Sequence, residues 1–231
     1  KTSKYFKYAI GEIILVVIGI LIALSINNWN QTRLDKLRSM DYHERLMEDI
    51  NFSISQSNNV NDVGQATLES IVKSIALLEK GNIETEEERA VFQHALVWYT
   101  RINYQIPNIS TLDEMESSGD LGLIYNAQLR NDLVKFKGYL KNVDDIFNKL
   151  GQAINISNLT FDKYLTSIVD PKSLNVSFKY NFEEMASDQE FINHFSRIAI
   201  HWRGNVFFSN QLLEKATNIK NQLTAELEIL K

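Results

Sequence analysis

The sequence contains no cysteine and only two prolines, and glycine occurs nine times in 231 residues. Without cysteine the fold has no disulfide and no thiolate metal site, and cysteine usage says nothing about the compartment. So few prolines and glycines disfavour the many tight turns of a β-sandwich or β-barrel. Long helices are the alternative that this composition favours.

Positive charge is also scarce. The chain has 24 Lys and Arg against 29 Asp and Glu, for a formal net charge of −5, and no segment gathers basic residues into a cluster. Because such a chain does not attract a phosphate backbone, we expect no nucleic acid partner. The hydrophobic share of 44% is ordinary for a folded protein and is sufficient for one domain with its own core.

One apolar run dominates the N-terminus. Residues 9–26 contain a single charged residue, Glu12, and an aromatic residue stands at each end of the stretch 8–29. As a helix this stretch is roughly 33 Å long, enough to cross the hydrocarbon core of a bilayer. Aromatic residues at both ends suit the two membrane interfaces. The pattern predicts an N-terminal flank and transmembrane anchor over residues 1–29.

A secretory signal peptide is the alternative interpretation, because three lysines precede the run and Ala23-Leu24-Ser25 resembles a cleavage site. The run is longer than a usual signal-peptide core, which favours a retained anchor. Basic residues flank it almost equally, but a short flank ahead of a large domain ordinarily stays in the cytoplasm. We therefore expect a single-pass protein of the bacterial inner membrane with a cytoplasmic N-terminus and a periplasmic domain over residues 30–231.

Glu12 is the ionisable residue of the predicted span. A charge at the centre of a membrane helix costs roughly 2.5–3.5 kcal/mol, and less near an end. Glu12, Gly19 and Ala23 fall within about 40° of one another around a helix, and Gly19 with Ala23 forms a small-xxx-small pair. These three residues are predicted to form a helix–helix interface with a second copy or another membrane subunit. The alternative is that Glu12 only reaches the headgroups.

The rest of the chain predicts an all-α fold, an elongated antiparallel helical bundle. Apolar residues recur at helical spacing over residues 31–80, and a polar interruption at 55–59 leaves open one long helix or two. Thr85 and Glu88 form a capping box for a helix that runs to about residue 104.

A heptad repeat predicts the next long helix. It begins behind a candidate N-cap, Asn126, continues to about Ile168, and is closed by Pro171. Phe147 lies in the middle of the repeat, so we expect it to be buried.

Shorter elements surround this helix. Thr111 and Glu114 are expected to cap a short helix that Gly119 ends. Alternation with period two predicts a short extended strap near 174–182. Asp188 is then expected to cap a final helix that continues to the end of the chain.

A search for chemistry is negative. The sequence has no phosphate-binding glycine-rich loop, no nucleophile elbow and no zinc-protease histidine pair. His194 and His201 lie seven residues apart on the last helix, and a metal there requires ligands from another helix. Because all four histidines fit ordinary boundary positions, we predict no enzyme, no cofactor and no metal site.

Two motifs carry a family resemblance. The first consists of YAIGEI at residues 8–13, LVVIGILIAL at 15–24 and INNWN at 26–30. The second, weaker motif is STLDEMESSGDL at residues 110–121, followed by a helix start with Asn126, Leu129, Arg130 and Leu133. Together they resemble an uncharacterised family of single-span membrane proteins from flavobacteria and related Bacteroidota. The resemblance implies an envelope location and a helical domain behind the span, and it supplies no catalytic residue.

These observations favour a non-enzymatic, membrane-anchored scaffold or accessory subunit of a bacterial envelope complex. The expected partners are the lipid bilayer and either further copies of the chain or other membrane-protein subunits. Two alternatives stay open: an extracytoplasmic ligand-binding or sensor domain, and a proton-linked membrane subunit that uses Glu12. The mass of the native detergent-solubilised particle discriminates best, because a lone monomer contradicts the scaffold.

Overall fold

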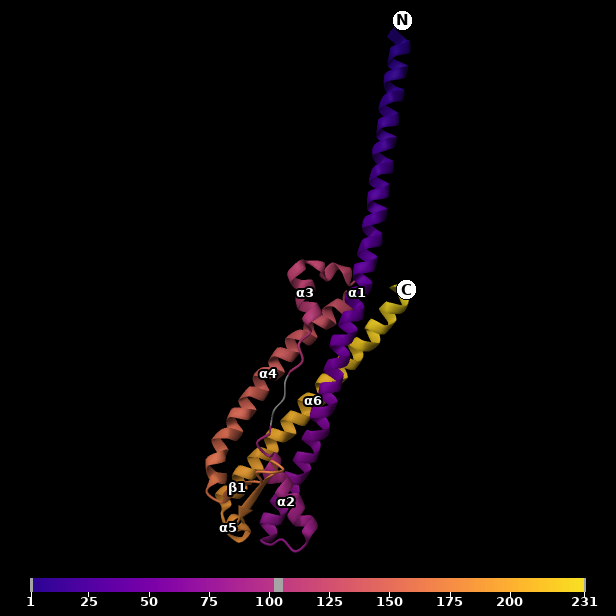
Figure 1. Ribbon diagram of the computed structural model, residues 1–231. Helices are drawn as coiled ribbons and strands as arrows, with labels where there is room; N and C mark the ends of the chain where they lie inside the picture. Colours follow the sequence, from indigo (N-terminus) through magenta and orange to yellow (C-terminus); the bar gives the residue numbers. More distant parts are fainter. Residues whose placement is uncertain (1, 102–105, 231) are drawn as a thin grey trace.

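The computed structural model describes residues 2–101 and 106–230. It is organised around one helix, α1 (Thr2–Lys80), of 79 residues, which is roughly 120 Å long. The first part of α1 stands free, and the remainder lies within a bundle of helices (Figure 1). Residues 31–80 therefore form one helix, not two. The polar interruption does not break it because Ser53 and Ser57 occupy buried positions on its inner face, and the Ser53 hydroxyl donates to the Asp49 carbonyl at 3.0 Å.

The chain reverses at the far end of α1 and forms α2 (Glu86–Trp98). The predicted capping box is confirmed, since Glu88 N lies 3.1 Å from Thr85 Oγ1 and Thr85 N lies 3.1 Å from Glu88 Oε2. The helix ends before the predicted residue 104: residues 99–101 are not helical, and 102–104 lie outside the described residues. One reason is that the Tyr99 carbonyl accepts a hydrogen bond from Trp202 Nε1 at 3.0 Å.

An irregular connection then returns along the bundle to α3 (Ser110–Ser118), the 3₁₀ helix η1 (Asp120–Leu123) and α4 (Ala127–Asp162). As a result α4 runs in the same direction as α1, and α6 (Gln189–Leu230) runs antiparallel to both (Figure 1).

The ends of these helices test three predicted caps. Asn126 is confirmed, because its Oδ1 accepts from Gln128 N at 2.9 Å. Gly119 ends α3 with a φ of +78°, also as predicted. The predicted Thr111–Glu114 cap is wrong: Thr111 N donates to Asp49 Oδ2 at 2.9 Å, so a carboxylate of α1 caps this helix from across the bundle.

A two-stranded hairpin replaces the end of the predicted heptad helix. Helix α4 stops at Asp162, and β1 (Leu165–Val169) pairs antiparallel with β2 (Val176–Tyr180). The β-branched residues of this stretch suit a strand better than a helix. Pro171 lies in the turn and does not close a helix, and Asp170 Oδ1 accepts from Lys172 N there at 2.7 Å. The predicted strap near 174–182 is confirmed as strand β2.

After the hairpin, α5 (Phe182–Ser187) leads into α6. Asp188 begins α6 as predicted, because its Oδ1 accepts from Glu190 N at 2.8 Å and from Phe191 N at 3.3 Å.

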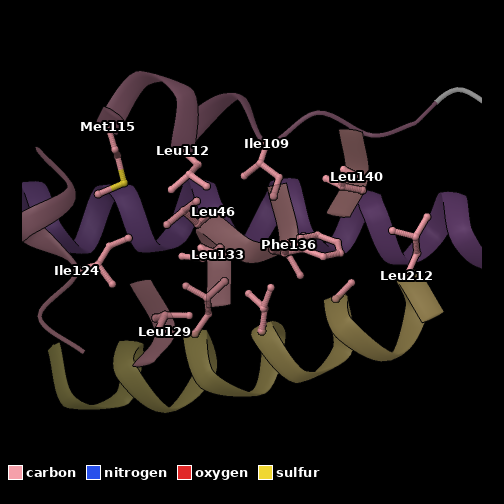
Figure 2. Close-up of a cluster of buried hydrophobic side chains, with 14 of the residues drawn as sticks. Leu46, Ile109, Leu112, Met115, Ile124, Leu129, Leu133, Phe136, Leu140 and Leu212 are labelled. Atoms are coloured by element: carbon pink, nitrogen blue, oxygen red, sulfur yellow. The ribbon is translucent and has the colours of Figure 1, made fainter. Parts of the chain in front are cut away.

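The buried side chains form two clusters. The cluster nearer the free part of α1 joins α1, α3, α4 and α6 (Figure 2). It includes Phe147, which is buried at 5% exposure as predicted. The far cluster joins α1, α2, α4, α5 and α6, with the hairpin packed against it, and is rich in aromatic rings. Apolar burial at both ends of the bundle holds the long helices together.

Between the two clusters α1 and α6 approach each other through small and polar residues. Gly64 makes this possible, because a Cβ on Gly64 would lie 3.1 Å from Val206 Cγ2 and 3.5 Å from Asn205 Oδ1. Asn205 and Ser209 are buried on the facing side of α6. The backbones of α1 and α6 therefore come close here because Gly64 has no side chain. The contact is not a layer of large apolar residues.

Candidate functional site: an exposed apolar helix and a polar collar

The free part of α1 is apolar and uncovered. It holds an 18-residue window that is long and apolar enough to cross a membrane, and none of that window is buried. Leu15, for example, is 71% exposed. Both a membrane span and a signal sequence have this character. Because a water-soluble surface rarely exposes so large an apolar area, the segment requires a cover that the described part of the chain does not supply.

The predicted interface residues lie on this free segment. Glu12, Gly19 and Ala23 are all exposed, and a Cβ on Gly19 would meet nothing within 4 Å. Since α1 is continuous, the three share one face of the helix. The structure brings the three residues together on a helix face. Their role in an interface stays a prediction.

Residues 30–37, the neck, connect the apolar window to the bundle. Every side chain of the neck is exposed or half-buried. Its hydrogen bonds are local: Gln31 Nε2 donates to Asp35 Oδ1 at 2.9 Å, and Thr32 Oγ1 donates to the Asn28 carbonyl at 2.9 Å. The neck is thus a bare helix that continues directly into the bundle.

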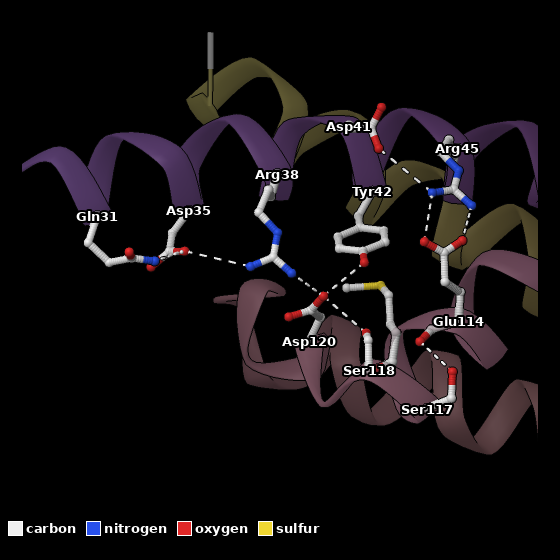
Figure 3. A network of polar contacts seen from close by, with 11 residues as sticks. Gln31, Asp35, Arg38, Asp41, Tyr42, Arg45, Glu114, Ser117, Ser118 and Asp120 are labelled. Carbon is white, nitrogen blue, oxygen red and sulfur yellow. Dashed lines mark hydrogen bonds and ion pairs between the residues drawn. The ribbon is translucent and has the colours of Figure 1, made fainter.

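A network of polar contacts, the collar, lies along one face of α1 where it enters the bundle (Figure 3). The collar consists of Arg38, Tyr42 and Arg45 of α1 with Glu114 and Asp120. Tyr42 Oη donates to Asp120 Oδ2 at 2.9 Å, and Arg38 forms an ion pair with the same carboxylate. One turn further, Arg45 forms a two-pronged ion pair with Glu114.

The collar is an electrostatic clamp as well as a packing contact. The hydrogen bond from Tyr42, assisted by Ser118 and Arg38, holds the pKa of Asp120 below its ordinary value of 3.8. The hydrogen bonds from Arg45 likewise lower the pKa of Glu114. Both acids are therefore carboxylates at neutral pH, and their ion pairs join α3 and η1 to α1 in addition to the apolar contacts.

This lowered pKa predicts a loss of stability in acid. A carboxylate with a lower pKa in the folded state adds stability above its unfolded pKa, and this stability is lost as pH falls through the folded pKa. Urea unfolding of the wild type and of Asp120→Asn should therefore differ most near neutral pH and converge below pH 3.8. In Tyr42→Phe the folded pKa of Asp120 should lie closer to 3.8, so the acid loss should be smaller and should be complete at a higher pH. Identical pH profiles for wild type and Asp120→Asn would contradict the clamp.

Sequence reasoning missed the collar. Arg38, Tyr42 and Arg45 are spaced four and three residues apart, which places them on one helix face. That spacing is visible in the sequence. Their acidic partners lie about seventy or eighty residues later, and no local pattern connects the two segments.

The histidines do not assemble a metal site. In residues 11–101 and 106–230, whose side chains are described apart from 156–159, no three His, Asp or Glu side chains come together as metal ligands. His194 and His201 lie at half-buried boundary positions, and His194 Nε2 is 3.7 Å from Glu190 Oε1. His43 differs from the expected boundary position, because it is fully buried and its Nδ1 lies 2.7 Å from the Ser39 carbonyl oxygen.

A groove of about 370 Å³ between α1 and α2 contains a serine–histidine contact. His94 Nδ1 lies 3.0 Å from Ser70 Oγ, a distance typical of an activated serine. The Ser70 hydroxyl, however, donates to the Thr67 carbonyl at 2.8 Å within its own helix. Burial lowers the pKa of His94. This serine is held by its helix backbone, so the contact fits a packing role better than nucleophilic catalysis.

The comparisons with known proteins give a family and no activity. No curated protein and no solved structure matches the chain. One family model matches residues 12–203, from Glu12 in the apolar segment to the first part of α6. The match covers the neck, the collar and most of the bundle together. The chain therefore belongs to a family of unknown function (DUF6090).

Proposed function

We propose that this chain is a single-span protein of the bacterial inner membrane whose helical domain acts as a non-enzymatic scaffold or accessory subunit of an envelope complex. The observation that carries the proposal is the apolar window of α1, none of which is buried although the helix continues directly into the bundle. A bilayer covers such a helix, and the apolar window is long enough to cross the hydrocarbon core.

The orientation follows from the large domain behind the span. We propose that the N-terminus is cytoplasmic and that the bundle lies in the periplasm. The short N-terminal flank supports this orientation, and the resemblance of residues 8–30 to single-span proteins of flavobacteria supports an envelope location. Protease added to spheroplasts should then remove the bundle and leave a small membrane-bound fragment. Protection of the intact chain would reverse the orientation, and a soluble domain beginning near Ile26 would identify a signal peptide.

Rigidity supports a scaffold. Because α1 is one helix, the span and the bundle are joined without a flexible linker, and the collar fixes α3 and η1 to the same helix. From Trp29 to Lys80 the helix extends roughly 77 Å, so it would hold the hairpin end of the bundle far from the bilayer. Among the described side chains no catalytic constellation competes with this interpretation.

Assembly through Glu12, Gly19 and Ala23 is the testable step. Lipid offers a carboxyl group no hydrogen-bond partner, whereas a neighbouring helix does, and no part of the chain that the structure describes covers this face, so a partner can reach it. Gly19→Leu and Glu12→Ala should each reduce the mass of the detergent-solubilised particle, measured by light scattering. Ile14→Leu, a substitution off that face, should leave the mass unchanged. A wild-type monomer, or unchanged mass in both variants, would refute assembly through this face.

A further inference from the structure

One face of α1 carries an aromatic residue and two cations at the end of the apolar window. Trp29, Arg33 and Lys36 are spaced four and three residues apart, so they lie within about 60° around the helix. All three are exposed, Trp29 by 67%. The three side chains therefore form a continuous surface on the bare helix.

Neither cation of this surface has an acidic partner. Within residues 11–101 and 106–230 no ion pair or hydrogen bond joins the side chain of Arg33 or Lys36 to another residue. The next arginines along α1 differ, because Arg38 pairs with Asp120 and Arg45 pairs with Glu114. Arg33 and Lys36 are therefore available to a ligand from outside the chain, whereas the two arginines that follow them on α1 are not.

Their distance from the apolar window suits a headgroup. Arg33 lies roughly 6 Å and Lys36 roughly 10 Å beyond Trp29 along the helix axis. A tryptophan at the edge of an apolar helix marks the membrane interface, and long basic side chains just outside it reach the phosphate level. The spacing therefore places one aromatic ring at the glycerol region and two positive charges among the phosphates.

We propose that Trp29, Arg33 and Lys36 form a binding face for the headgroups of anionic phospholipids. This inference rests on the proposed membrane span and adds a specific ligand. Charge complementarity favours an anionic phospholipid as the ligand, because two unpaired cations beside an interfacial ring attract a negatively charged lipid surface. Binding there fixes the depth of α1 in the bilayer and hence the height of the collar above it.

Lipid selectivity of the full chain tests the proposal. The chain is reconstituted into vesicles of phosphatidylcholine with a minor share of phosphatidylglycerol, and the motionally restricted fraction of a spin-labelled lipid of either kind is measured. The wild type should favour phosphatidylglycerol by roughly fivefold, the effect of about one cation near an anionic surface. Arg33→Gln/Lys36→Gln should reduce this preference, and the lysines that precede the apolar run account for any remainder.

Two controls make the result decisive. Lys141→Gln/Lys149→Gln removes two exposed lysines of α4 and should keep the preference, which excludes an effect of net charge alone. Arg33→Lys/Lys36→Arg should also keep it, because the charges stay. Undiminished preference in the glutamine variant would overturn the binding face while leaving the span intact. If the wild type restricts neither lipid and alkaline carbonate extracts it, the proposed span itself fails.

Discussion

Replacing Phe195 with alanine should lower the free energy of unfolding by about 3–5 kcal/mol. Phe195 is fully buried on α6 and belongs to the far cluster. Its ring centroid lies 5.4 Å from that of Phe161, 6.0 Å from that of Phe191 and 6.4 Å from that of Tyr99. Truncation removes these contacts from α4, α6 and the end of α2 at once, and close-packed surroundings relax only in part.

A matched control lies on the same helix. Phe207 is 56% exposed, so Phe207→Ala should change stability by less than about 1 kcal/mol. Denaturant unfolding of the full chain in detergent, followed by circular dichroism, measures both variants. Equal losses for the two substitutions would show that the far cluster does not stabilise this end of the bundle.

The second large effect concerns the contact between α1 and α6. Gly64→Leu should cost about 1–3 kcal/mol, because overpacking forces side chains off their rotamers or moves the backbone. Even a Cβ at this position would lie 3.1 Å from Val206 Cγ2, and a leucine extends further into α6. The same unfolding measurement reports the loss.

A compensating substitution tests whether the cause is steric. Val206→Ala removes the atom nearest to the new side chain, so Gly64→Ala combined with Val206→Ala should be more stable than the sum of the two single effects predicts. Additive losses would mean that helix propensity at residue 64, not its approach to α6, determines the result. Alanine is more favourable than glycine in a helix by about 1 kcal/mol. If helix propensity alone determined the result, Gly64→Ala would therefore raise the free energy of unfolding.

Sequence reasoning succeeded where the signal was local. The capping box at Thr85, the cap at Asn126 and the left-handed end at Gly119 each depend on residues within one turn, and all three are confirmed. The burial of Phe147 followed from a heptad repeat in the same helix. Short-range chemistry of this kind is fully present in a single sequence.

The inner face of α1 shows why periodicity was insufficient. Core positions of this helix hold Ser53, Ser57, Gly64 and Thr67, which a search for apolar spacing does not count. Around Gly64 these inward positions hold small residues, because the neighbouring α6 approaches closely. The small residues of α1 are explained only by the size of the residues that face them in α6. The two helices are far apart in the sequence.

Partners across the bundle account for the other errors. The helix expected at Thr111 is capped by Asp49 of α1. Helix α2 ends where Trp202 of α6 donates a hydrogen bond to the Tyr99 carbonyl. In α4 the heptad positions continue past Asp162, but pairing between β1 and β2 favours a strand there. Each case is a tertiary interaction that overrides a local preference.

The pairing of α1 with α6 has a consequence for biosynthesis. The residues that cover the Gly64 region, Trp202, Asn205 and Val206, belong to α6, which is translated after α1, α2 and α4. Contacts between such distant segments close late because the intervening chain must first be ordered. Throughout translation α1 therefore presents an inner face without its permanent neighbour, and a nascent chain in that state is prone to misassembly. A chain truncated before α6 should consequently depend on chaperones or be degraded, even with its apolar N-terminal segment complete.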